Sequence, residues 1–327
     1  MDPLVNEIVL LLRTRKTASG WTPTELAAAL GISRARVHRG LDELRALGYE
    51  LTAGRNESLR ITRSPDRMID TEILAGLKTR IMARQLHCYN RIGSTNARAL
   101  ELAEARAPEG TIVVAEEQTS GRGRLGRVWH SPPGLGIWAS FILRPQLPLQ
   151  KAAAVSLLAA LAFAQTVEDD LGLKVDLKWP NDGLIAGRKV FGVLTEVSAE
   201  VDRVYYVICG TGINVAHRLE DFPPALRQTA GSLAHACGRP LDRLAFFRSF
   251  LTHFEAVYRR FRRDGLTPFL ADYRDRSLLL GREVTIHYGQ KSIQGQAVAI
   301  DDHGALILRT TTGDITVVAG EATLREQ

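Results

Sequence analysis

Residues 121–129, with the sequence GRGRLGRVW, place three glycines and three arginines in seven positions and a tryptophan two positions later. The apolar residues 111–115 precede this run, and residues 131–134 (SPPG) lead from it to a second apolar stretch at 136–143. The apolar stretches predict strands, and the residues between them predict a loop. Glycines let backbone amides approach an anion closely, and arginines match phosphate oxygens. The sequence therefore predicts a sheet carrying a flexible loop that closes over a nucleotide phosphate.

Two other interpretations of this loop stay open, a disordered RNA-binding tail and a solvated basic loop without a ligand. Its place between two strand candidates in a folded region argues against a tail. The run spells GxGxxG, but a strand and not a helix follows it, and the Walker pattern GxxxxGK[ST] is absent from the sequence. The usual phosphate cradles are therefore not predicted, and the spacing alone leaves the ligand open.

The length of 327 residues is enough for two or three domains, and a composition of 45% hydrophobic and 24% charged residues is ordinary for a globular protein. A net charge of +6 permits an acidic partner such as nucleic acid. Three widely separated cysteines fit reduced thiols in the cytosol better than disulfides or a zinc site. Residues 152–167 are apolar and Ala-rich but short for a bilayer, so we expect a buried helix, no membrane partner and a cytoplasmic location.

Capping signals divide the first 64 residues into short helices followed by a hairpin. The first helix is expected to reach about Lys16, Thr22 opens a capping box for the second, and Ser33 caps the third. Residues 49–52 and 59–62 alternate like paired strands. This order predicts a winged helix-turn-helix that binds DNA, with a module for protein contacts as the alternative. The candidate DNA contacts are Thr22, Ser33, Arg34, Arg36, His38 and Arg39.

The rest of the chain reads as a linker with a helix (65–84), a mixed α/β domain (85–277) and a small closed β-barrel (278–327), which gives an α+β fold class overall. Helices are expected at 95–105, 149–171, 224–237, 241–263 and 267–276, and strands at 111–116, 136–143, 175–179, 183–186, 190–197 and 204–209. A short hairpin turn at Gly187 and Arg188 makes the predicted sheet a mixed one.

Four polar segments are expected near the arginine-rich loop. Residues 94–96 (STN) begin a helix, and Gln118 ends the strand that leads into the loop. Residues 178–182 (KWPND) and 210–214 (GTGIN) end two further strands, the second in a glycine turn. A helix cap, polar strand ends and a glycine turn can together line one pocket.

The motifs GRGRxGRxW, KWPND and GxGINV, in this order, resemble those of the biotin protein ligases. With the N-terminal helix-turn-helix, the chain is similar to the bifunctional members that also repress the biotin operon, and the match spans nearly the whole chain. The resemblance implies a class II synthetase-like ligase domain and an SH3-like C-terminal barrel. It also implies that biotin and ATP, with Mg²⁺, form biotinyl-5′-adenylate, and that biotin then passes to a lysine of the biotin carrier protein of acetyl-CoA carboxylase. The other implied partners are operator DNA and a second copy of the chain, joined as a homodimer when adenylate binds.

The resemblance also implies roles for single residues. Lys178, Arg122 and Arg124 would be catalytic, with Lys178 between the biotin carboxylate and the α-phosphate, where positive charge offsets the repulsion of two anions. The residues implied to contact biotin are Ser94, Thr95, Asn96, Gln118, Gly121, Arg122, Gly123, Arg124, Lys178 and Gly210. Those implied to contact ATP or the adenylate are Arg124, Arg127, Trp129, Asn181, Asn214 and Arg325. No dedicated metal site is expected, because Mg²⁺ arrives with ATP.

The chain departs from the family pattern at Leu125, where an arginine is frequent, and at the hairpin tip, residues 54–58 (GRNES), where a Gly-Lys-Gly-Tyr type of tip is expected of a repressor. Three alternatives therefore stay open: a lipoate or other acyl ligase, a ligand-sensing repressor without catalysis, and a ligase whose winged helix no longer binds DNA. Structural roles also stay open for Trp129, Trp138 and Trp179 as core aromatics, and for Asp182 and Glu196, which could pair structurally.

Overall fold

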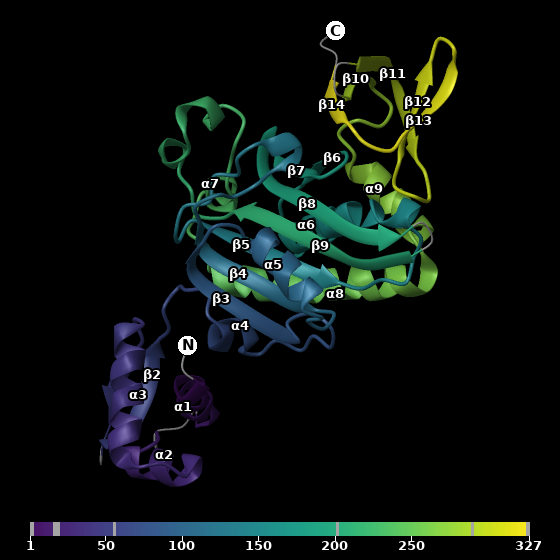
Figure 1. Ribbon diagram of the computed structural model, residues 1–327. Coiled ribbons are helices and arrows are strands. Elements are labelled where there is room, and N and C mark those ends of the chain that lie inside the picture. The colour runs from purple at the N-terminus through teal and green to yellow at the C-terminus, as the bar shows by residue number, and fades with distance from the viewer. Residues whose placement is uncertain (1–2, 16–19, 55–56, 201–202, 289–290, 325–327) are drawn as a thin grey trace. The chain divides into compact units, whose positions relative to one another are not determined.

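The computed structural model describes residues 3–15, 20–54, 57–200, 203–288 and 291–324. The chain divides into two compact units, Met1–Gly76 and Leu77–Gln327, drawn in Figure 1. Arg325, predicted to contact the nucleotide, and residues 55–56 of the predicted hairpin tip lie outside the described residues.

The first unit contains the three expected helices and the expected hairpin. They are α1 (Pro3–Thr14), α2 (Pro23–Leu30), α3 (Arg34–Ala46), β1 (Glu50–Ala53) and β2 (Leu59–Arg63), followed by a short α4 (Asp70–Leu74). The predicted capping box is present, because Thr22 Oγ1 accepts from the Glu25 backbone N–H at 3.2 Å and a Glu25 carboxylate oxygen accepts from the Thr22 N–H at 2.8 Å. Apolar side chains from α1, α2, α3 and the hairpin form one core.

A seven-stranded sheet with the order β3-β4-β5-β9-β8-β7-β6 is the centre of the second unit. Its strands are β3 (Gln85–Ile92), β4 (Thr111–Gln118), β5 (Gly136–Leu143), β6 (Asp176–Lys178), β7 (Asp182–Ile185), β8 (Arg188–Glu200) and β9 (Arg203–Asn214). Only the β3–β4 pair is parallel, and the turn between β7 and β8 follows the predicted hairpin, so the expectation of a mixed sheet is confirmed. The sequence analysis missed β3, an edge strand whose side chains are mostly half-exposed and polar.

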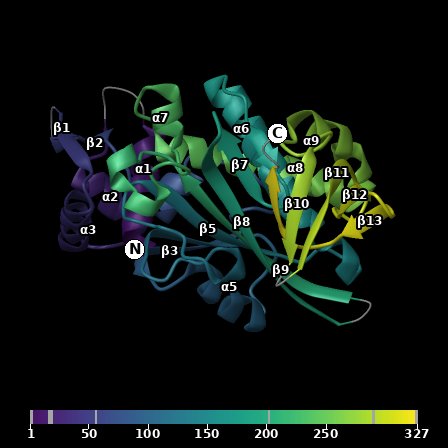
Figure 2. The same ribbon diagram turned by 90° about the horizontal axis from the view of Figure 1, so that it is seen from above.

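Helices cover both faces of this sheet. Figure 2 shows α5 (Thr95–Glu104) on one face and α6 (Ala154–Leu171) with α8 (Arg243–Asp264) on the other. Residues 149–171 are long and apolar enough to cross a membrane by length and composition, yet 78% of the most apolar window is buried within the fold. The expected core helix is therefore confirmed, and α6 packs on α8 and on the sheet.

Two sequence-based expectations in this unit are wrong. Residues 224–237 do not form one helix but η5 (Pro224–Leu226) and α7 (Leu233–Cys237). The backbone between them pairs with the start of β8, since Lys189 N donates to Thr229 O at 2.8 Å and Gly231 N donates to Lys189 O at 2.9 Å. Residues 210–214 do not form a glycine turn, because β9 continues through them in register with β5 and β8.

Described residues between Glu283 and Leu324 form a five-stranded antiparallel sheet with the order β13-β12-β11-β10-β14. It follows η6 (Thr267–Phe269) and α9 (Leu270–Arg276), and its strands are β10 (Glu283–Tyr288), β11 (Lys291–Ile300), β12 (Leu306–Thr310), β13 (Gly313–Val317) and β14 (Glu321–Leu324). No pairing between β13 and β14 closes this sheet among the described residues. The closed barrel accordingly stays a prediction.

Candidate active site

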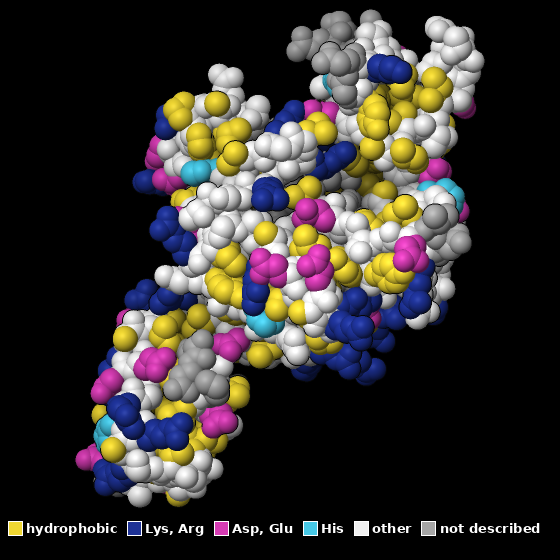
Figure 3. Space-filling view, in the orientation of Figure 1, with side chains coloured by type: hydrophobic (Ala, Val, Ile, Leu, Met, Phe, Trp, Pro, Cys, Tyr) yellow, Lys and Arg dark blue, Asp and Glu magenta, His cyan; other side chains and the backbone are white. Residues whose placement is uncertain are grey.

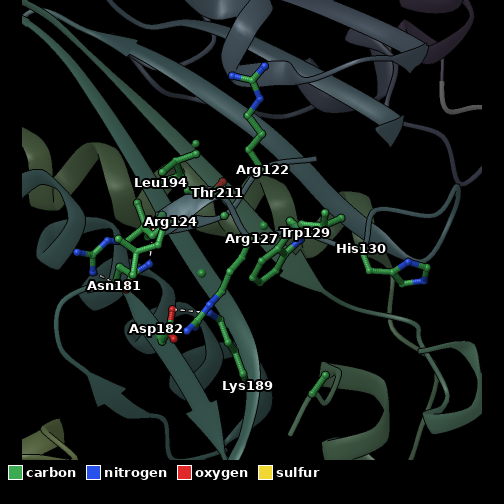
Figure 4. Close-up of a pocket in the computed structure, with 18 of the residues that line it drawn as sticks. Arg122, Arg124, Arg127, Trp129, His130, Asn181, Asp182, Lys189, Leu194 and Thr211 are labelled. Atoms are coloured by element: carbon green, nitrogen blue, oxygen red, sulfur yellow. Dashed lines mark hydrogen bonds and ion pairs between the residues drawn. The ribbon is translucent and has the colours of Figure 1, made fainter. Parts of the chain in front are cut away.

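A cavity of about 490 Å³ opens on the α5 side of the large sheet. Its lining comes from the N-terminus of α5, residues 122–130, the β6–β7 region, the first half of β8, the end of β9, residues 222–230 and the start of β14. This size lies within the usual range for small-molecule sites. Segments far apart in the sequence therefore meet around one hollow, as the close-up in Figure 4 illustrates.

Most residues predicted to bind biotin or nucleotide line this one cavity: Ser94, Thr95, Asn96, Gln118, Arg122, Gly123, Arg124, Arg127, Trp129, Lys178, Asn181, Gly210 and Asn214. Gly121 is buried beside the loop ends instead, and a Cβ there would lie 2.5 Å from Trp129 O. Glycine at 121 therefore serves the close approach of the two ends of the arginine loop, the name used below for residues 121–129.

The N-terminus of α5 is held by a chain of hydrogen bonds. Ser94 caps the helix, and the backbone N–H and hydroxyl of Thr95 both donate to Gln118 Oε1, at 2.8 and 3.0 Å. Gln118 Nε2 donates to Ser131 Oγ at 3.0 Å, which leaves one amide N–H of Gln118 without a protein acceptor among the described residues. Sequence reasoning missed Ser131, which follows the arginine loop and carries no motif of its own.

Asn96 lies on the sheet at the floor of the cavity and is almost fully buried. Its Oδ1 accepts from Ser140 Oγ at 2.6 Å, while its Nδ2 donates to Leu194 O at 3.2 Å and to Glu196 Oε2 at 2.8 Å. A Cβ at Gly210 would lie 1.9 Å from Asn96 Oδ1. The Asn96 amide therefore occupies the space above Gly210, so a glycine is required at this position of β9.

Lys178 ends β6 and lines the cavity, and its ammonium has no hydrogen bond or ion pair within the described parts of the chain. Two other polar groups of the KWPND segment are engaged. Asn181 Nδ2 donates to Val193 O at 2.7 Å, and Asp182 forms an ion pair with Lys189 at 2.6 Å. Asp182 and Glu196 therefore each have a structural partner, Lys189 and Asn96 respectively, and they do not pair with each other.

Two of the three tryptophans with open structural roles are core residues, whereas Trp129 is half-buried and lines the cavity. Trp138 and Trp179 are buried, and their indole N–H groups donate to backbone oxygens, those of Glu116 and Gly304 respectively. The core interpretation is therefore confirmed for both.

The arginines of the loop differ in their surroundings. Arg124 is half-buried, donates to Asn181 Oδ1 at 3.3 Å, and has a pKa lowered chiefly by burial. Arg127 is exposed and forms two hydrogen bonds to the Glu321 carboxylate, at 2.7 and 2.5 Å. Figure 4 shows Arg122 directed away from Asp182 and Lys189. Arg124 is thus the arginine whose charge already lies inside the cavity.

Trp129 packs on two glycines of the sheet. A Cβ at Gly212 would lie 2.4 Å from the indole ring, and a Cβ at Gly192 would lie 2.7 Å from it. Lys189 Nζ lies 5.2 Å from the ring centroid, a distance that allows a cation–π contact. The ring therefore forms part of the cavity wall beside one cation, Lys189.

Besides Ser131, three polar residues of this site were not singled out in the sequence. Lys189 follows the β7–β8 turn and Ser140 lies within an apolar strand, so neither has a distinguishing local pattern. Glu321 lies in the segment from which Arg325 was selected, and its pairing with Arg127 depends on contacts between distant segments. Among the described residues, no group of three or more His, Cys, Asp or Glu side chains is placed to hold a metal ion.

The residues predicted to contact DNA lie at the start of α2 and on the outer side of α3. The side chains of Thr22 and Ser33 cap these two helices. Arg34, Arg36, His38 and Arg39 are exposed, whereas Val37 and Gly40 of the same helix are buried. In the space-filling view, Lys and Arg side chains gather over the α2–α3 part of this unit (Figure 3). Apart from Arg34, which lies 3.8 Å from Glu57, these side chains form no ion pair in the described part of the unit.

Two family models and several known proteins are similar to this chain. A family model described as the Biotin/lipoate A/B protein ligase family matches residues 88–214, and one described as the Biotin protein ligase C terminal domain matches residues 279–325. A bifunctional ligase/repressor BirA from Bacillus subtilis (strain 168) is 44% identical over 289 residues, which are 88% of this chain and 89% of that protein. A biotin–[acetyl-CoA-carboxylase] ligase from Mycobacterium tuberculosis is 34% identical and covers 73% of this chain and 88% of its own length.

A solved structure agrees with these sequence matches. The biotin protein ligase from Aquifex aeolicus in complex with biotin and ATP matches with a TM-score of 0.64 and 31% identity, covering 75% of this chain and 100% of that one. The sheet, the cavity and the arginine loop of the second unit are thus found in a chain that belongs to the biotin protein ligase family.

Proposed function

We propose that the protein is an ATP-dependent ligase that activates biotin as biotinyl-5′-AMP, transfers biotin to a lysine of a biotin carrier protein, and represses the biotin operon through its first unit. The observation that carries this proposal is the unpaired Lys178 ammonium in a cavity with a neutral polar floor at Asn96 and a cationic side at Arg124. The names and coverage of the relatives support both activities.

Lys178 is the residue we assign to charge stabilisation. Attack of a carboxylate on an α-phosphate brings two anions together, and an ammonium between them lowers the energy of the transition state. The pKa of Glu321 is lowered by Arg127 and, to a smaller extent, by Lys178, which indicates that the Lys178 charge acts in this part of the cavity. Because no partner neutralises Lys178 within the described residues, its charge is available to a ligand.

The α5 end of the cavity fits the ring of biotin. Gln118 has one amide N–H to donate to a ligand, and Asn96 has one lone pair of Oδ1 to accept from a ligand. A cyclic urea offers a matching acceptor and donor. We therefore place the ring between Asn96 and Gln118, with Ser94, Thr95 and Gly210 around it and the carboxylate toward Lys178.

The arginine loop fits the nucleotide. Arg124 and Arg127 bring guanidiniums to the cavity side, and Trp129 offers a ring edge next to them, while Asn181 and Asn214 fix the surrounding backbone. ATP with its Mg²⁺ supplies the activated α-phosphate when bound. Closure of the loop over the adenylate would exclude water from a mixed anhydride that water would otherwise hydrolyse.

Residues 1–64, within the first unit, are assigned as a winged helix-turn-helix and residues 65–84 as a linker. Residues 85–277 are assigned as a class II synthetase-like domain and residues 278–327 as an SH3-like barrel. The exposed cations of α3 would contact operator DNA, together with Thr22 at the N-terminus of α2 and Ser33 at the N-terminus of α3. We further propose a homodimer on adenylate binding, because one small module reads too few bases for an operator, and a cytoplasmic location.

Adenylation is the direct test. Incubation of the pure protein with biotin, Mg²⁺ and α-labelled ATP is expected to give biotinyl-adenylate and pyrophosphate. We expect Lys178→Ala to lower the rate of adenylate formation by about a hundredfold or more, the size found when one charge-stabilising donor is removed. Lys174→Ala, which changes an exposed lysine next to the same strand, is the control. Normal turnover of the Lys178 variant would remove Lys178 from the mechanism.

The alternatives are distinguished by two further measurements. Adenylation of lipoic acid and not biotin would indicate a lipoate ligase, and ligand-dependent DNA binding without pyrophosphate release would indicate a repressor without catalysis. A mobility shift with operator DNA, compared between the native chain and Arg39→Ala, tests the first unit. Ligase activity with no shift would indicate a ligase whose winged helix no longer binds DNA.

A further inference from the structure

The Asn96 amide is held in one orientation by groups on both sides. Its Nδ2 faces two acceptors, Leu194 O at 3.2 Å and Glu196 Oε2 at 2.8 Å, and its Oδ1 faces the Ser140 hydroxyl at 2.6 Å. A reversed amide would set an oxygen against a carboxylate and a carbonyl. Two hydrogen bonds would be lost in a buried position, so the orientation follows from the partners.

This arrangement limits what Asn96 can offer to a ligand. An amide nitrogen has two N–H donors, and both are used by Leu194 and Glu196. The oxygen has two lone pairs, and Ser140 uses one. Asn96 lines the cavity, so toward a ligand it can act only as a hydrogen-bond acceptor.

Of the residues that the structure describes, Asn96 and Leu194 line the cavity, whereas Glu196 does not. Glu196 follows Leu194 by two positions in β8 and thus lies on the same face of the sheet, one step further along. Leu194 pairs with Gly210, over which the Asn96 amide lies. Glu196 therefore touches the amide from outside the cavity and can act on a ligand only through Asn96.

We propose that Glu196 is a positioning residue that makes Asn96 a pure acceptor and so selects acids whose ring carries an N–H donor. The inference rests on the proposed function and adds how the same site rejects other acids. A cyclic urea can donate to Asn96 Oδ1. A dithiolane ring or a plain alkyl chain has no donor, so it would leave the buried Oδ1 lone pair without a partner, which is the general basis of strong rejection by polar sites.

The test compares acids with and without a ring N–H. In Glu196→Met, an unbranched apolar side chain of similar length replaces the carboxylate, so one Nδ2 proton loses its acceptor and the amide can reverse. We expect the KM values for biotin and desthiobiotin to rise about tenfold, the effect of one hydrogen bond, while kcat changes less. The KM for ATP and the inhibition constant of octanoic acid should stay within about threefold of the native values, because neither depends on the Asn96 orientation.

Two control variants separate positioning from stability. Glu196→Gln keeps an acceptor for Asn96 and should stay near the native KM for biotin, whereas a purely electrostatic role would make it as weak as Glu196→Met. Glu200→Leu removes an exposed carboxylate from the same strand and should leave all four constants unchanged. If Glu196→Met does not fold, Glu196→Ala is measured in the same way.

Each result decides between outcomes. Equal weakening of biotin and octanoic acid in the variant, or no weakening of either, would overturn the inference while the proposed ligase activity stands. A native protein that forms no biotinyl-adenylate would instead reject the proposed function itself.

Discussion

The cavity has two sides built in different ways. The sheet wall, formed by Thr95, Asn96, Ser140 and Gly210, is buried, and its polar side chains are hydrogen-bonded to one another or to neighbouring strands. The arginine loop is exposed, with Leu125 and Val128 at 73% and 81% of full exposure. Leu125 also has a φ of 56°, in the left-handed region that leucine rarely adopts.

From this contrast we infer different functions for the two sides of the cavity. The sheet wall is already ordered, so a ligand that matches its donors and acceptors binds without ordering the protein, and the wall can discriminate between acids. The arginine loop makes few buried contacts, so a change in its conformation costs little free energy. We expect it to become ordered when phosphates bind. Recognition of the acid would then depend on the wall, and retention of the adenylate on the loop.

The support of the sheet wall gives the largest expected effect. Arg243 at the start of α8 is buried and donates to Glu116 Oε2 at 3.2 and 3.3 Å and to Gly136 O at 2.9 Å, which joins β4 to β5. Replacing one partner of a buried ion pair leaves the other charge without compensation. We expect Arg243→Met to lower the free energy of unfolding by about 3–5 kcal/mol, measured by urea denaturation.

The matched control for this variant is Arg263→Met on the same helix, where the ion pair with Asp264 is exposed. A change of no more than about 0.5 kcal/mol is expected there, as for most surface positions. If both variants are equally stable, the wall does not depend on the buried pair.

Gly210→Ala changes the wall itself. The added Cβ would lie 1.9 Å from Asn96 Oδ1, so the amide must leave its three hydrogen bonds or the strand must shift. Overpacking of this kind costs about 1–3 kcal/mol, and a loss of this size in biotin binding would raise the KM for biotin by about five- to 140-fold. The KM for ATP should change much less, since the nucleotide is assigned to the loop side.

Gly93→Ala is the control for Gly210→Ala, because a Cβ at Gly93 meets no atom within 4 Å. It should leave both KM values unchanged. An unaltered biotin KM in Gly210→Ala would indicate that the wall is not preformed.

The segment that covers the cavity carries a buried histidine. His217 stacks on Phe222, which lines the cavity, with ring centroids 4.5 Å apart, and burial with help from His130 lowers the pKa of His217 to about 4. The unfolded chain, with a histidine pKa of about 6.5, binds the proton first as the pH falls, so the stabilisation is complete above about pH 6.5 and is lost toward pH 4.

At pH 5 this difference amounts to about 2 kcal/mol of lost stability relative to pH 7.5. His217→Phe keeps the stacking and cannot be protonated, so its unfolding free energy should fall by about 2 kcal/mol less than that of the native protein between these two pH values. Urea denaturation at both pH values gives the comparison. Parallel losses in the two proteins would mean that other groups cause the acid sensitivity.

The same contrast explains what the sequence could predict. Capping residues such as Thr22 and Ser33, and apolar strands such as 136–143, act locally, so the helices and strands they mark were predicted with bounds close to those observed. Gly210 and Gly212 were predicted as a turn because glycine favours turns. Their real cause, the Asn96 amide and the Trp129 ring lying on the strand, depends on residues more than 80 positions away.

Other misses have similar causes. Residues 224–237 have helical composition, but pairing of residues 229–231 with Lys189 takes the backbone groups that a helix would use. The motifs identified nearly all of the cavity lining, because their residue types are those that ligands require. Ser140, which orients Asn96, was not identified, and Glu196 was named without its partner, since a serine or glutamate in a strand has no local signal for the residue it contacts.

The loop gives the smallest expected effect. Arg127 and Glu321 have side-chain exposures of 65% and 33%, so their ion pair contributes only about 0.2–1 kcal/mol and is screened by salt. Glu321 competes with a nucleotide phosphate for the Arg127 guanidinium, because the two side chains form an ion pair. We therefore expect Glu321→Gln to lower the KM for ATP by about two- to fivefold. Arg127→Ala should raise this KM. Both shifts should shrink in 0.5 M salt, roughly where the screening length falls below about 5 Å.

The double variant Arg127→Ala with Glu321→Gln distinguishes competition from unrelated effects of the two changes. If the carboxylate acts only by holding Arg127, its removal has no effect once the arginine is gone, and the double variant should have the ATP KM of Arg127→Ala. Additive effects would mean that Glu321 acts on the nucleotide by another route, through Lys178 for example, whose charge also lowers the pKa of Glu321. In that case the arginine loop would be coupled to the C-terminal sheet through Lys178. The sheet wall and the arginine loop would then not act independently of each other.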